Sequence, residues 1–397
     1  MATRVGVILI AGFMVLFVGG GSRFAIGLTL KPMVEEFGWA RGQLGMAVAA
    51  YMVVSAVATL VAGRLADRFS ARLLLGAGTL IGGVGIGLMC LVSAPWHAML
   101  LYGLVFAIGN GVASMVTVGV MVTRSVGRRT GFANAAVVSG TSLGQLVMIA
   151  ALAAALLSIG WRAAFVWLAI AHIVLIPFLW FTLPSRAGAA PGSAPHEGMS
   201  LTEAARTRPF WQLLAIYAIC GLDDFFVSTH VVAFAQDRGV DTLFAGNLLA
   251  LMGLTGLIGV LLGGVFSDRS GPVLATATAF GARVLVLGLI VIDQSATSIA
   301  IFALVFGATF LVTAPLTLMF VRDHFGLKHL GTLTGLITMV HQIAGGIGAY
   351  GGALLFDVTG SYDIAFMVML VATALALVLT LTLGRPQPRE VKLNPPA

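Results

Sequence analysis

The chain has 397 residues, of which 59% are hydrophobic and 9% are charged, and its mean hydropathy is +1.03. Soluble domains carry about 45–50% apolar and about 25% charged residues, so this composition excludes a soluble enzyme, a disordered protein and a disulfide scaffold. The formal net charge of +7 indicates basic loops beside a membrane rather than a nucleic-acid site. These values predict an integral membrane protein.

A helix that crosses a hydrocarbon layer of about 30 Å needs about 20 apolar residues. Twelve apolar runs of this length follow one another along the chain, separated by charged residues or by Pro and Gly. We therefore predict an all-α fold with twelve transmembrane helices. The predicted spans are residues 5–31, 41–65, 72–94, 97–123, 131–158, 161–183, 209–236, 242–266, 272–292, 296–321, 330–356 and 362–383.

The distribution of basic residues predicts the orientation of these spans. If the N-terminus is cytoplasmic, 16 of the 22 Lys and Arg residues fall in cytoplasmic segments and 4 fall outside, while Arg23 and Arg283 lie within spans. Lys and Arg are enriched in cytoplasmic loops. We therefore expect a multi-pass protein of the bacterial cytoplasmic (inner) membrane with both termini in the cytoplasm.

The second half of the chain repeats the first at an offset of about 201 residues. The segment Gly63–Phe69 (GRLADRF) follows the second predicted span, and Gly264–Ser270 (GVFSDRS) follows the eighth. The one long polar segment, 184–208, is rich in Ala, Gly, Pro and Ser, as flexible linkers are, and its Ser-Leu-Thr-Glu sequence fits a helix capping box. We predict two pseudo-symmetric six-helix bundles, residues 1–183 and 209–397, joined by this cytoplasmic linker, with a short cytoplasmic tail.

The pattern Gly-x-Leu-Ala-Asp-Arg-Phe, together with its echo after span eight, resembles the major facilitator superfamily over nearly the whole chain. The resemblance implies two halves that bind a substrate between them near the midplane and work by alternating access. It also implies that the loop aspartates cap neighbouring helices and latch the halves on the cytoplasmic side. The candidate latch residues are Asp67, Arg68, Arg72, Asp268 and Arg269.

Ionisable side chains inside the predicted spans are candidate functional groups, because a charge at the bilayer centre costs about 2.5–3.5 kcal/mol. Arg23 and Asp224 are equivalent under the 201-residue offset, and spans one and seven face each other in the resembled fold. We predict that they pair across the two halves; a static pair within one half is the alternative. Asp223 and Asp224 are the candidate proton carriers, and the sequence does not decide between them.

The segment Thr229–Gly239 resembles span seven of bacterial permeases related to the monocarboxylate and oxalate–formate transporters. Those transporters usually carry an arginine in span eight, where this chain has only Gly, Val and Leu in the segment Gly259–Gly263. Arg283 in span nine either supplies that positive charge or forms a static ion pair. The candidate substrate-binding residues are Arg23, Asn110, His230, Arg283 and His341.

No phosphate-binding Gly-x-x-x-x-Gly-Lys-Ser/Thr loop is present, so ATP is not expected to drive this protein. The sequence predicts a secondary active transporter and not an enzyme, working by proton-coupled symport of a small organic anion such as a monocarboxylate. The alternatives are a proton-driven exporter of drugs or metabolites and a non-transporting sensor of the same fold. We expect protons, the substrate and the lipid bilayer as partners, no nucleic acid, cofactor or metal, and a monomeric state.

Overall fold

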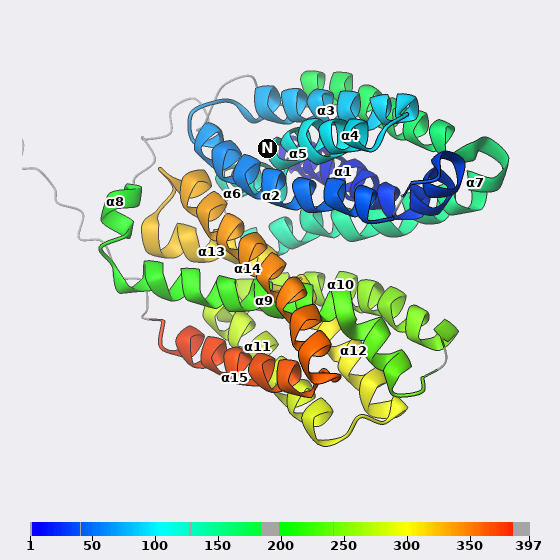
Figure 1. Ribbon diagram of the computed structural model, residues 1–397. Helices are drawn as coiled ribbons and strands as arrows, with labels where there is room; N and C mark the ends of the chain where they lie inside the picture. Colours follow the sequence, from blue (N-terminus) through cyan, green and yellow to red (C-terminus); the bar gives the residue numbers. More distant parts are fainter. Residues whose placement is uncertain (1, 40, 127–128, 184–197, 241, 384–397) are drawn as a thin grey trace, which may run out of the picture.

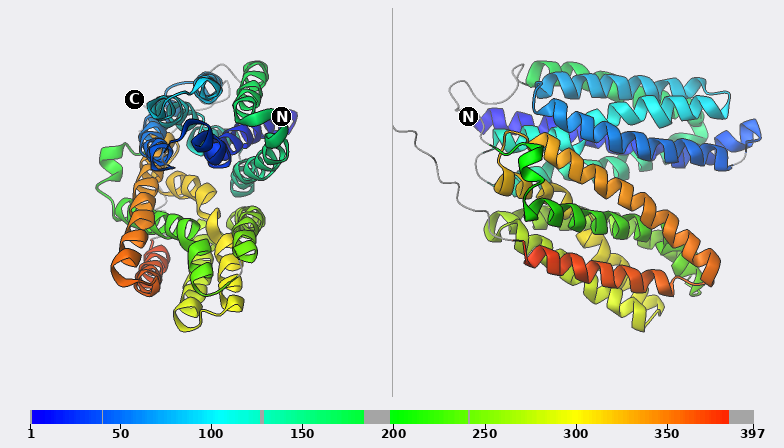
Figure 2. Two further views of the ribbon diagram at one scale, coloured as in Figure 1. Left: turned by 45° about the vertical axis from the view of Figure 1, so that its right-hand side comes forward. Right: turned by 60° about the vertical axis from the view of Figure 1, so that its left-hand side comes forward.

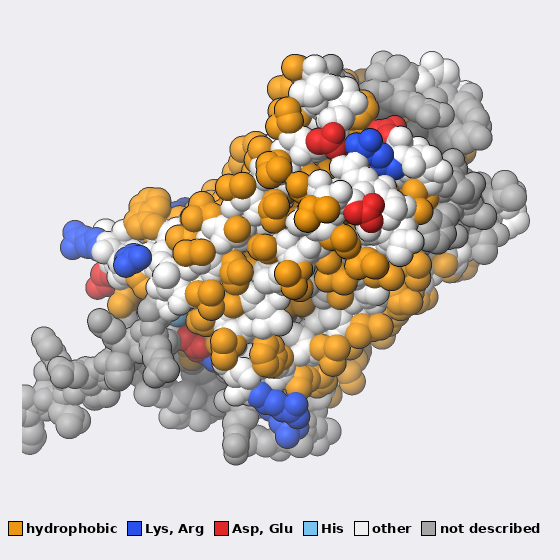
Figure 3. All heavy atoms as spheres, turned by 90° about the horizontal axis from the view of Figure 1, so that it is seen from below, with side chains coloured by type: hydrophobic (Ala, Val, Ile, Leu, Met, Phe, Trp, Pro, Cys, Tyr) orange, Lys and Arg blue, Asp and Glu red, His pale blue; other side chains and the backbone are white. Residues whose placement is uncertain are grey.

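The computed structural model describes residues 2–39, 41–126, 129–183, 198–240 and 242–383. Twelve helical segments in this range are long and apolar enough to cross a membrane, which confirms the predicted fold class. Hydrophobic side chains cover the middle of the face drawn in Figure 3, and charged side chains gather toward its ends. The surface therefore matches the composition: an apolar belt meets lipid and charged side chains lie outside it.

The helices up to residue 182 lie together in Figure 1 and form what we call the first bundle. Its fourth span is built from four consecutive elements, α4, η2, α5 and α6. The elements of the first bundle are α1 (Ala2–Phe37), α2 (Arg41–Ala66), α3 (Ala71–Leu88), η1 (Met89–Leu91), α4 (Pro95–Ala98), η2 (Met99–Phe106), α5 (Ala107–Val112), α6 (Met115–Ser125) and α7 (Thr130–Thr182).

The helices after residue 207 form the second bundle (Figure 1). The fourth span of this bundle, which is the tenth of the chain, is also divided, into α12 and α13. The elements are α9 (Arg208–Asp237), α10 (Thr242–Ser270), α11 (Pro272–Ile292), α12 (Ala296–Phe310), α13 (Thr313–Phe325), α14 (Leu330–Thr359) and α15 (Asp363–Leu381).

One helix of the first bundle, α7, contains both predicted spans 131–158 and 161–183. Gly160 separates them with φ 72° and ψ 165°, a conformation that glycine adopts without the steric cost of a side chain. The chain turns at this glycine, so the two parts of α7 cross the membrane region in opposite directions.

The predicted linker lies partly outside the described residues, at 184–197, and the expected tail lies outside them from residue 384. The described part of the linker contains the short helix α8 (Leu201–Ala204), which begins with the expected capping box between Ser200 and Glu203. The N–H of Met199 donates to the carbonyl of Phe325 at 2.8 Å. The end of the linker is therefore attached to the turn between α13 and α14.

The two bundles meet through glycines at one end. A Cβ on Gly63 of α2 would meet the carbonyl oxygen of Gly331 of α14, and a Cβ on Gly264 of α10 would lie 2.9 Å from the carbonyl oxygen of Gly131 of α7. We call this the latch end, because Asp67 lies beside it. Figure 2 shows the helices of the two bundles diverging toward the opposite end, the far end.

Each bundle carries an ion pair at the far end, and the two pairs have reversed charges. Glu36, at the end of α1, accepts from Trp161 Nε1 at 2.7 Å and pairs with Arg162 at 2.7 Å. The hydrogen bond from Trp161, followed by that from Arg162, lowers the pKa of the Glu36 carboxyl. In the second bundle Arg238 pairs with Asp363 at 3.0 Å. Both pairs join the end of the bundle's first span to the start of its sixth.

Candidate functional site

Asp67 of the first bundle caps a helix of the second bundle. Its carboxylate accepts the backbone N–H groups of Gly331 at 2.9 Å and Thr332 at 2.8 Å, and the Thr332 hydroxyl at 2.7 Å. These groups belong to the first turn of α14, whose own N-cap residue, His329, makes no side-chain capping bond. Asp67 therefore supplies both the acceptor and the negative charge that a helix N-terminus favours.

Asp268 of the second bundle likewise caps a helix of the first bundle. It accepts the N–H groups of Gly131 and Phe132, both at 2.8 Å, at the start of α7 in the first bundle. The N-cap residue of α7, Arg129, makes no side-chain capping bond either. Each bundle thus caps one helix of the other.

The basic residue that pairs with Asp67 is Arg124, which the sequence presents only as a loop charge. Its Nη2 lies 2.7 Å from Asp67 Oδ1 and 2.8 Å from the carbonyl oxygen of Leu327 in the second bundle. The other basic candidates do not cross between the bundles: Arg72 donates to the Leu183 carbonyl at 2.7 Å. Arg68 and Arg269 are exposed and make no ion pair within the described ranges.

The two caps differ in the number of bonds they make, and this difference predicts unequal effects of mutation. Asp67→Ala removes three hydrogen bonds across the interface and the ion pair with Arg124, whereas Asp268→Ala removes two hydrogen bonds. Hydrogen bonds to charged groups are worth about 1.5–3 kcal/mol each, and about 1.4 kcal/mol changes an equilibrium tenfold. We expect Asp67→Ala to separate the latch ends in a larger fraction of molecules than Asp268→Ala.

Spin labels at the exposed positions 68 and 269 would report the separation of the latch ends as a distance distribution. Equal distance distributions in Asp67→Ala and Asp268→Ala would contradict the expectation that Asp67→Ala opens the latch end more. A distribution unchanged from the parent in both variants would show that neither aspartate holds the bundles together.

The second bundle contains a fully buried ion pair. Arg283 of α11, which is 0% exposed, places Nη1 2.8 Å from Oδ1 of Asp224 on α9. Its other nitrogens donate to Thr309 of α12, Nε to the hydroxyl at 3.0 Å and Nη2 to the carbonyl at 3.1 Å. The guanidinium carbon also lies 4.5 Å from the ring centre of Phe306. Because the charge is paired and its donors are occupied, this arginine is accommodated in an apolar bundle.

Two further groups face the second oxygen of Asp224. The Cys220 thiol lies 3.5 Å from Oδ2, and His341 Nε2 of α14 lies 3.6 Å from it. The donor atoms of these three residues lie within 4.8 Å of one another, as metal ligands do. However, Arg283 already supplies the positive charge there, 3.8 Å from the sulfur. His341 is the member that reaches solvent, with 21% of its side chain exposed.

Asp223, next in the chain to Asp224, faces α15 and not Arg283. Its Oδ2 lies 2.7 Å from the hydroxyl oxygen of Thr373, and that hydroxyl lies 2.7 Å from the carbonyl of Met369. A hydroxyl has one hydrogen to donate, and a carbonyl only accepts. All these contacts are satisfied when Asp223 carries a hydrogen and donates it to Thr373, so the geometry favours a neutral Asp223.

Arg23 of α1 is partly buried in the first bundle and makes no ion pair within the described part of the chain. Its guanidinium carbon lies 5.7 Å from the ring centre of Tyr51, and its carbonyl accepts from the Tyr102 hydroxyl at 2.5 Å. The predicted pair between Arg23 and Asp224 is absent in this conformation, because Asp224 is already paired inside its own bundle. Arg23 thus lies in a membrane span without an acidic partner among the described residues.

One contact between the bundles lies close in the chain to both Tyr51 of α2 and His341 of α14. Ser55 of α2 lies 3.5 Å from the side-chain oxygen of Gln342 of α14. Tyr51, which contacts Arg23, is one helical turn from Ser55 on α2, and His341 directly precedes Gln342. This contact between the bundles is thus next to His341 in the chain and one helical turn from Tyr51.

The other two substrate-binding candidates are engaged within their own bundles. Asn110 donates to the carbonyl of Gly19 at 3.2 Å. His230 contacts the Ala349 carbonyl through Nε2 at 2.8 Å and the Tyr362 hydroxyl through Nδ1 at 3.2 Å. Since both ring nitrogens of His230 have partners, this histidine connects α9 with α14 and has no nitrogen left for another ligand here.

Comparison with known proteins agrees with this architecture. A family model described as Major Facilitator Superfamily matches residues 12–349. The uncharacterized MFS-type transporter YcxA of Bacillus subtilis (strain 168) is 25% identical over 88% of this chain and 90% of its own length. Monocarboxylate transporter 11 of Homo sapiens is 24% identical over 91% of this chain and 79% of its own.

Solved structures show the same fold. The crystal structure of FucP, a major facilitator superfamily transporter in the outward conformation, matches with a TM-score of 0.73 at 16% identity, covering 95% of this chain and 98% of that chain. The twelve spans, the reciprocal aspartate caps and the family match over most of the sequence lead to one conclusion. The chain belongs to the Major Facilitator Superfamily of membrane transporters.

Proposed function

We propose that this protein is a secondary transporter that carries a small organic anion, such as a monocarboxylate, together with a proton by alternating access. The observation that carries the proposal is the placement of basic groups inside the spans: Arg23, which has no acidic partner among the described residues, in one bundle, and His341 beside Asp224 in the other. The similarity to a human protein named as a monocarboxylate transporter supports the same substrate class.

Arg23 is the proposed anchor for the substrate carboxylate. A guanidinium offers a planar pair of donors that matches a carboxylate, and an uncompensated cation inside a membrane span is costly without an anionic partner. Tyr51, which is buried in the first bundle, contacts the guanidinium through its ring. A bound carboxylate would neutralise the charge of Arg23.

His341 and Asp224 are the proposed proton site. Asp224 and Arg283 together carry no net charge, and His341 lies on their accessible side. Protonating the imidazole would bring its Nε2 into an ion pair with Asp224 and give the cluster a net positive charge. In a low-dielectric site that charge favours an incoming anion, so the proton and the anion would bind together, as symport requires.

We also propose that the latch end faces the cytoplasm, so that this structure represents the form open to the outside. Among the basic residues whose side chains the structure describes, most gather at the latch end, whereas Arg162 and Arg238 lie at the far end. Basic residues favour the cytoplasmic side. The residues at the latch end are Arg64, Arg68, Arg72, Arg124, Arg129, Arg206, Arg208, Arg269, Arg322 and Lys328.

A thermal-shift screen of the purified protein tests the substrate class. Short monocarboxylates should raise the midpoint of thermal unfolding because a ligand that binds only the folded state stabilises it. The corresponding primary amides and alcohols should not raise it. Stabilisation by uncharged or cationic drug-like compounds, with none by carboxylates, would favour the exporter and refute the proposed substrate class.

Arg23 variants provide a quantitative prediction. We expect Arg23→Gln to weaken carboxylate binding about 10- to 100-fold, the loss of a charged hydrogen bond of about 1.5–3 kcal/mol. Arg23→Lys should retain part of the affinity because it keeps the charge but loses the bidentate geometry. Arg206→Gln, at an exposed arginine of the latch end, is the control. Equal affinity in Arg23→Gln and the control would remove Arg23 from the site.

A further inference from the structure

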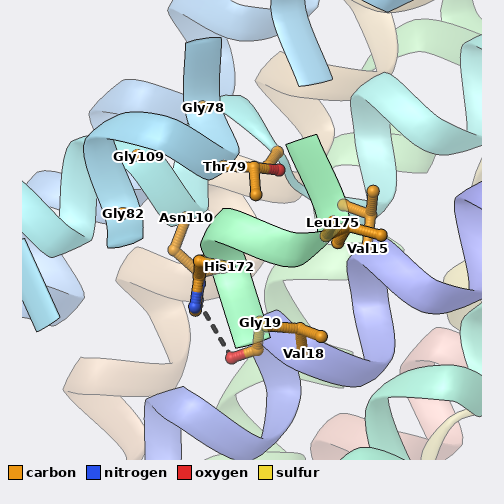
Figure 4. A pocket seen from close by; sticks show the side chains of 11 residues that line it. Val15, Val18, Gly19, Gly78, Thr79, Gly82, Gly109, Asn110, His172 and Leu175 are labelled. Carbon is orange, nitrogen blue, oxygen red and sulfur yellow. Dashed lines mark hydrogen bonds between the residues drawn. The ribbon is translucent and has the colours of Figure 1, made fainter. Parts of the chain in front are cut away.

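A small cavity lies inside the first bundle, away from the interface between the bundles. Residues of α1, α3, α5 and the second part of α7 line it, and it has room for about one water molecule. Figure 4 shows Thr79 at its wall and the hydrogen bond from Asn110 to Gly19 that borders it. Glycines leave the space open: a Cβ on Gly82 would have no atom closer to it than 3.7 Å.

Three lining residues, Thr79, Asn110 and His172, each have a polar side-chain atom without a protein partner among the described residues. His172, which is 4% exposed, places Nδ1 2.9 Å from the Leu168 carbonyl, so Nδ1 carries the hydrogen and Nε2 is an acceptor. Asn110 donates its amide to Gly19, so its Oδ1 is also an acceptor. Neither Nε2 nor Oδ1 has a protein donor among the described residues, and the buried Thr79 hydroxyl has no protein partner there either.

The 201-residue repeat shows what occupies the equivalent place in the second bundle. The offset relates Gly19 to Cys220 and Gly82 to Arg283. In the second bundle the Arg283 guanidinium fills this position, 3.8 Å from the Cys220 sulfur, and donates to Thr309. In the first bundle glycine replaces the arginine, and His172 Nε2 lies 3.7 Å from where a Cβ on Gly82 would be. The second bundle thus has the Arg283 guanidinium at this position, whereas the first bundle has a cavity beside Gly82 that is lined by the acceptors His172 Nε2 and Asn110 Oδ1.

We propose that one ordered water molecule occupies this cavity and takes the place that the guanidinium takes in the second bundle. It donates one hydrogen to His172 Nε2 and the other to Asn110 Oδ1, and it accepts from the Thr79 hydroxyl. Three hydrogen bonds are the usual number for a buried water. A cation fits less well, because no acidic side chain lines the cavity.

The water has a definite structural role. It connects α3, α5 and the second part of α7, and through Asn110 it reaches Gly19, one turn before Arg23 on α1. Residues 19–21 are three consecutive glycines, and a Cβ on Gly20 or Gly21 would collide with Thr141 or Met148 of α7, so α1 packs closely against α7 at this point. The hydrogen bond from Asn110 to Gly19 joins α1 to α5 at this point, and the water connects Asn110 to His172 and Thr79.

A density map of the whole protein at a resolution that shows waters is the direct test. A single peak within hydrogen-bonding distance of His172 Nε2 and Asn110 Oδ1 is expected, and a cavity without a peak would overturn the proposal. Thermal unfolding in sodium chloride and in choline chloride separates water from a cation. Equal midpoints are expected, and a rise with sodium alone would replace the water with a cation.

A double-mutant cycle tests the energetics without a map. Thr79→Val keeps the shape of the side chain and removes its hydroxyl, and His172→Phe removes the acceptor. Each should lower the unfolding midpoint by a few degrees, and the double variant should lose less than the two effects combined, because both act on one water. Additive effects would overturn the proposal. If His172→Phe does not fold, Thr79→Val combined with Asn110→Leu gives the same cycle.

Discussion

Replacing Asp224 with alanine is expected to cost about 3–5 kcal/mol of stability, the typical effect of removing one partner of a buried ion pair. Arg283 is 0% exposed and has no other acidic partner within 4 Å among the described residues. Its guanidinium would remain charged in an apolar bundle. The measurement is the midpoint of thermal or denaturant unfolding of the purified variant, with expression level as a coarse indicator.

The neighbouring aspartate is a matched control. Asp223 is equally buried, but it forms no ion pair among the described residues, and its Oδ2 lies 2.7 Å from the hydroxyl oxygen of Thr373. Asp223→Asn places an amide N–H where the acid O–H lies, so it should change stability little. Asp224→Asn should resemble Asp224→Ala, because an amide does not neutralise Arg283. If Asp223→Asn is the more damaging of the two, the assignment of charge to these aspartates is wrong.

The double variant Asp224→Asn with Arg283→Gln separates stability from transport. It removes both charges, so it should fold better than Asp224→Asn alone, and the coupling between the two changes should be large. Transport should nevertheless lose its proton dependence, because His341 would no longer face a carboxylate. A double variant that retains proton-driven transport would remove Asp224 from the proposed proton site.

Introducing a methyl group at Gly63 is expected to shift the conformational equilibrium strongly. The Cβ of Gly63→Ala would meet the carbonyl oxygen of Gly331 in the opposite bundle, so backbone would have to move for the latch end to stay closed. This contact exists only while the latch end is closed. The variant should therefore favour the form in which the latch end opens and the far end closes.

Two other glycines serve as controls. A Cβ on Gly76 meets nothing within 4 Å, so Gly76→Ala should leave the equilibrium unchanged. A Cβ on Gly144 would meet the carbonyl of Phe17 within the first bundle, so Gly144→Ala should lower stability in every conformation. Spin labels at Ser93 and Thr297, both exposed at the far end, report the shift as a shorter distance. An equal distance between the labels at positions 93 and 297 in Gly63→Ala and Gly76→Ala would refute the proposal that Gly63 controls closure of the latch end.

The spans and the two aspartate caps were predictable because their signals are local. About 20 apolar residues in succession specify a membrane helix, and twelve such runs correspond to twelve helices. The Asp67 and Asp268 loops follow spans two and eight at an offset of 201 residues, so one motif predicted both. The predicted boundary between residues 158 and 161 also coincides with Gly160, where the backbone leaves the helical conformation and the chain turns.

The partner of Asp224 was not predictable from the repeat. The offset relates Asp224 to Arg23 as equivalent positions, but equivalence under pseudo-symmetry does not mean contact. Asp224 pairs with Arg283 because α9 and α11 pack in one bundle, and the sequence left this static alternative open. Arg124 was missed because its position at the end of span four resembles any basic loop residue. Only the fold brings it to Asp67.

Uptake into liposomes under an imposed pH gradient tests the central claim most directly. Purified protein is reconstituted, and entry of a labelled monocarboxylate identified by the thermal-shift screen is followed with the outside acidic, with no gradient, and with a protonophore. We predict faster uptake and transient accumulation with the acidic exterior, both abolished by the protonophore and both absent in Asp224→Asn with Arg283→Gln. Uptake at the same rate in all three conditions would contradict proton-coupled symport.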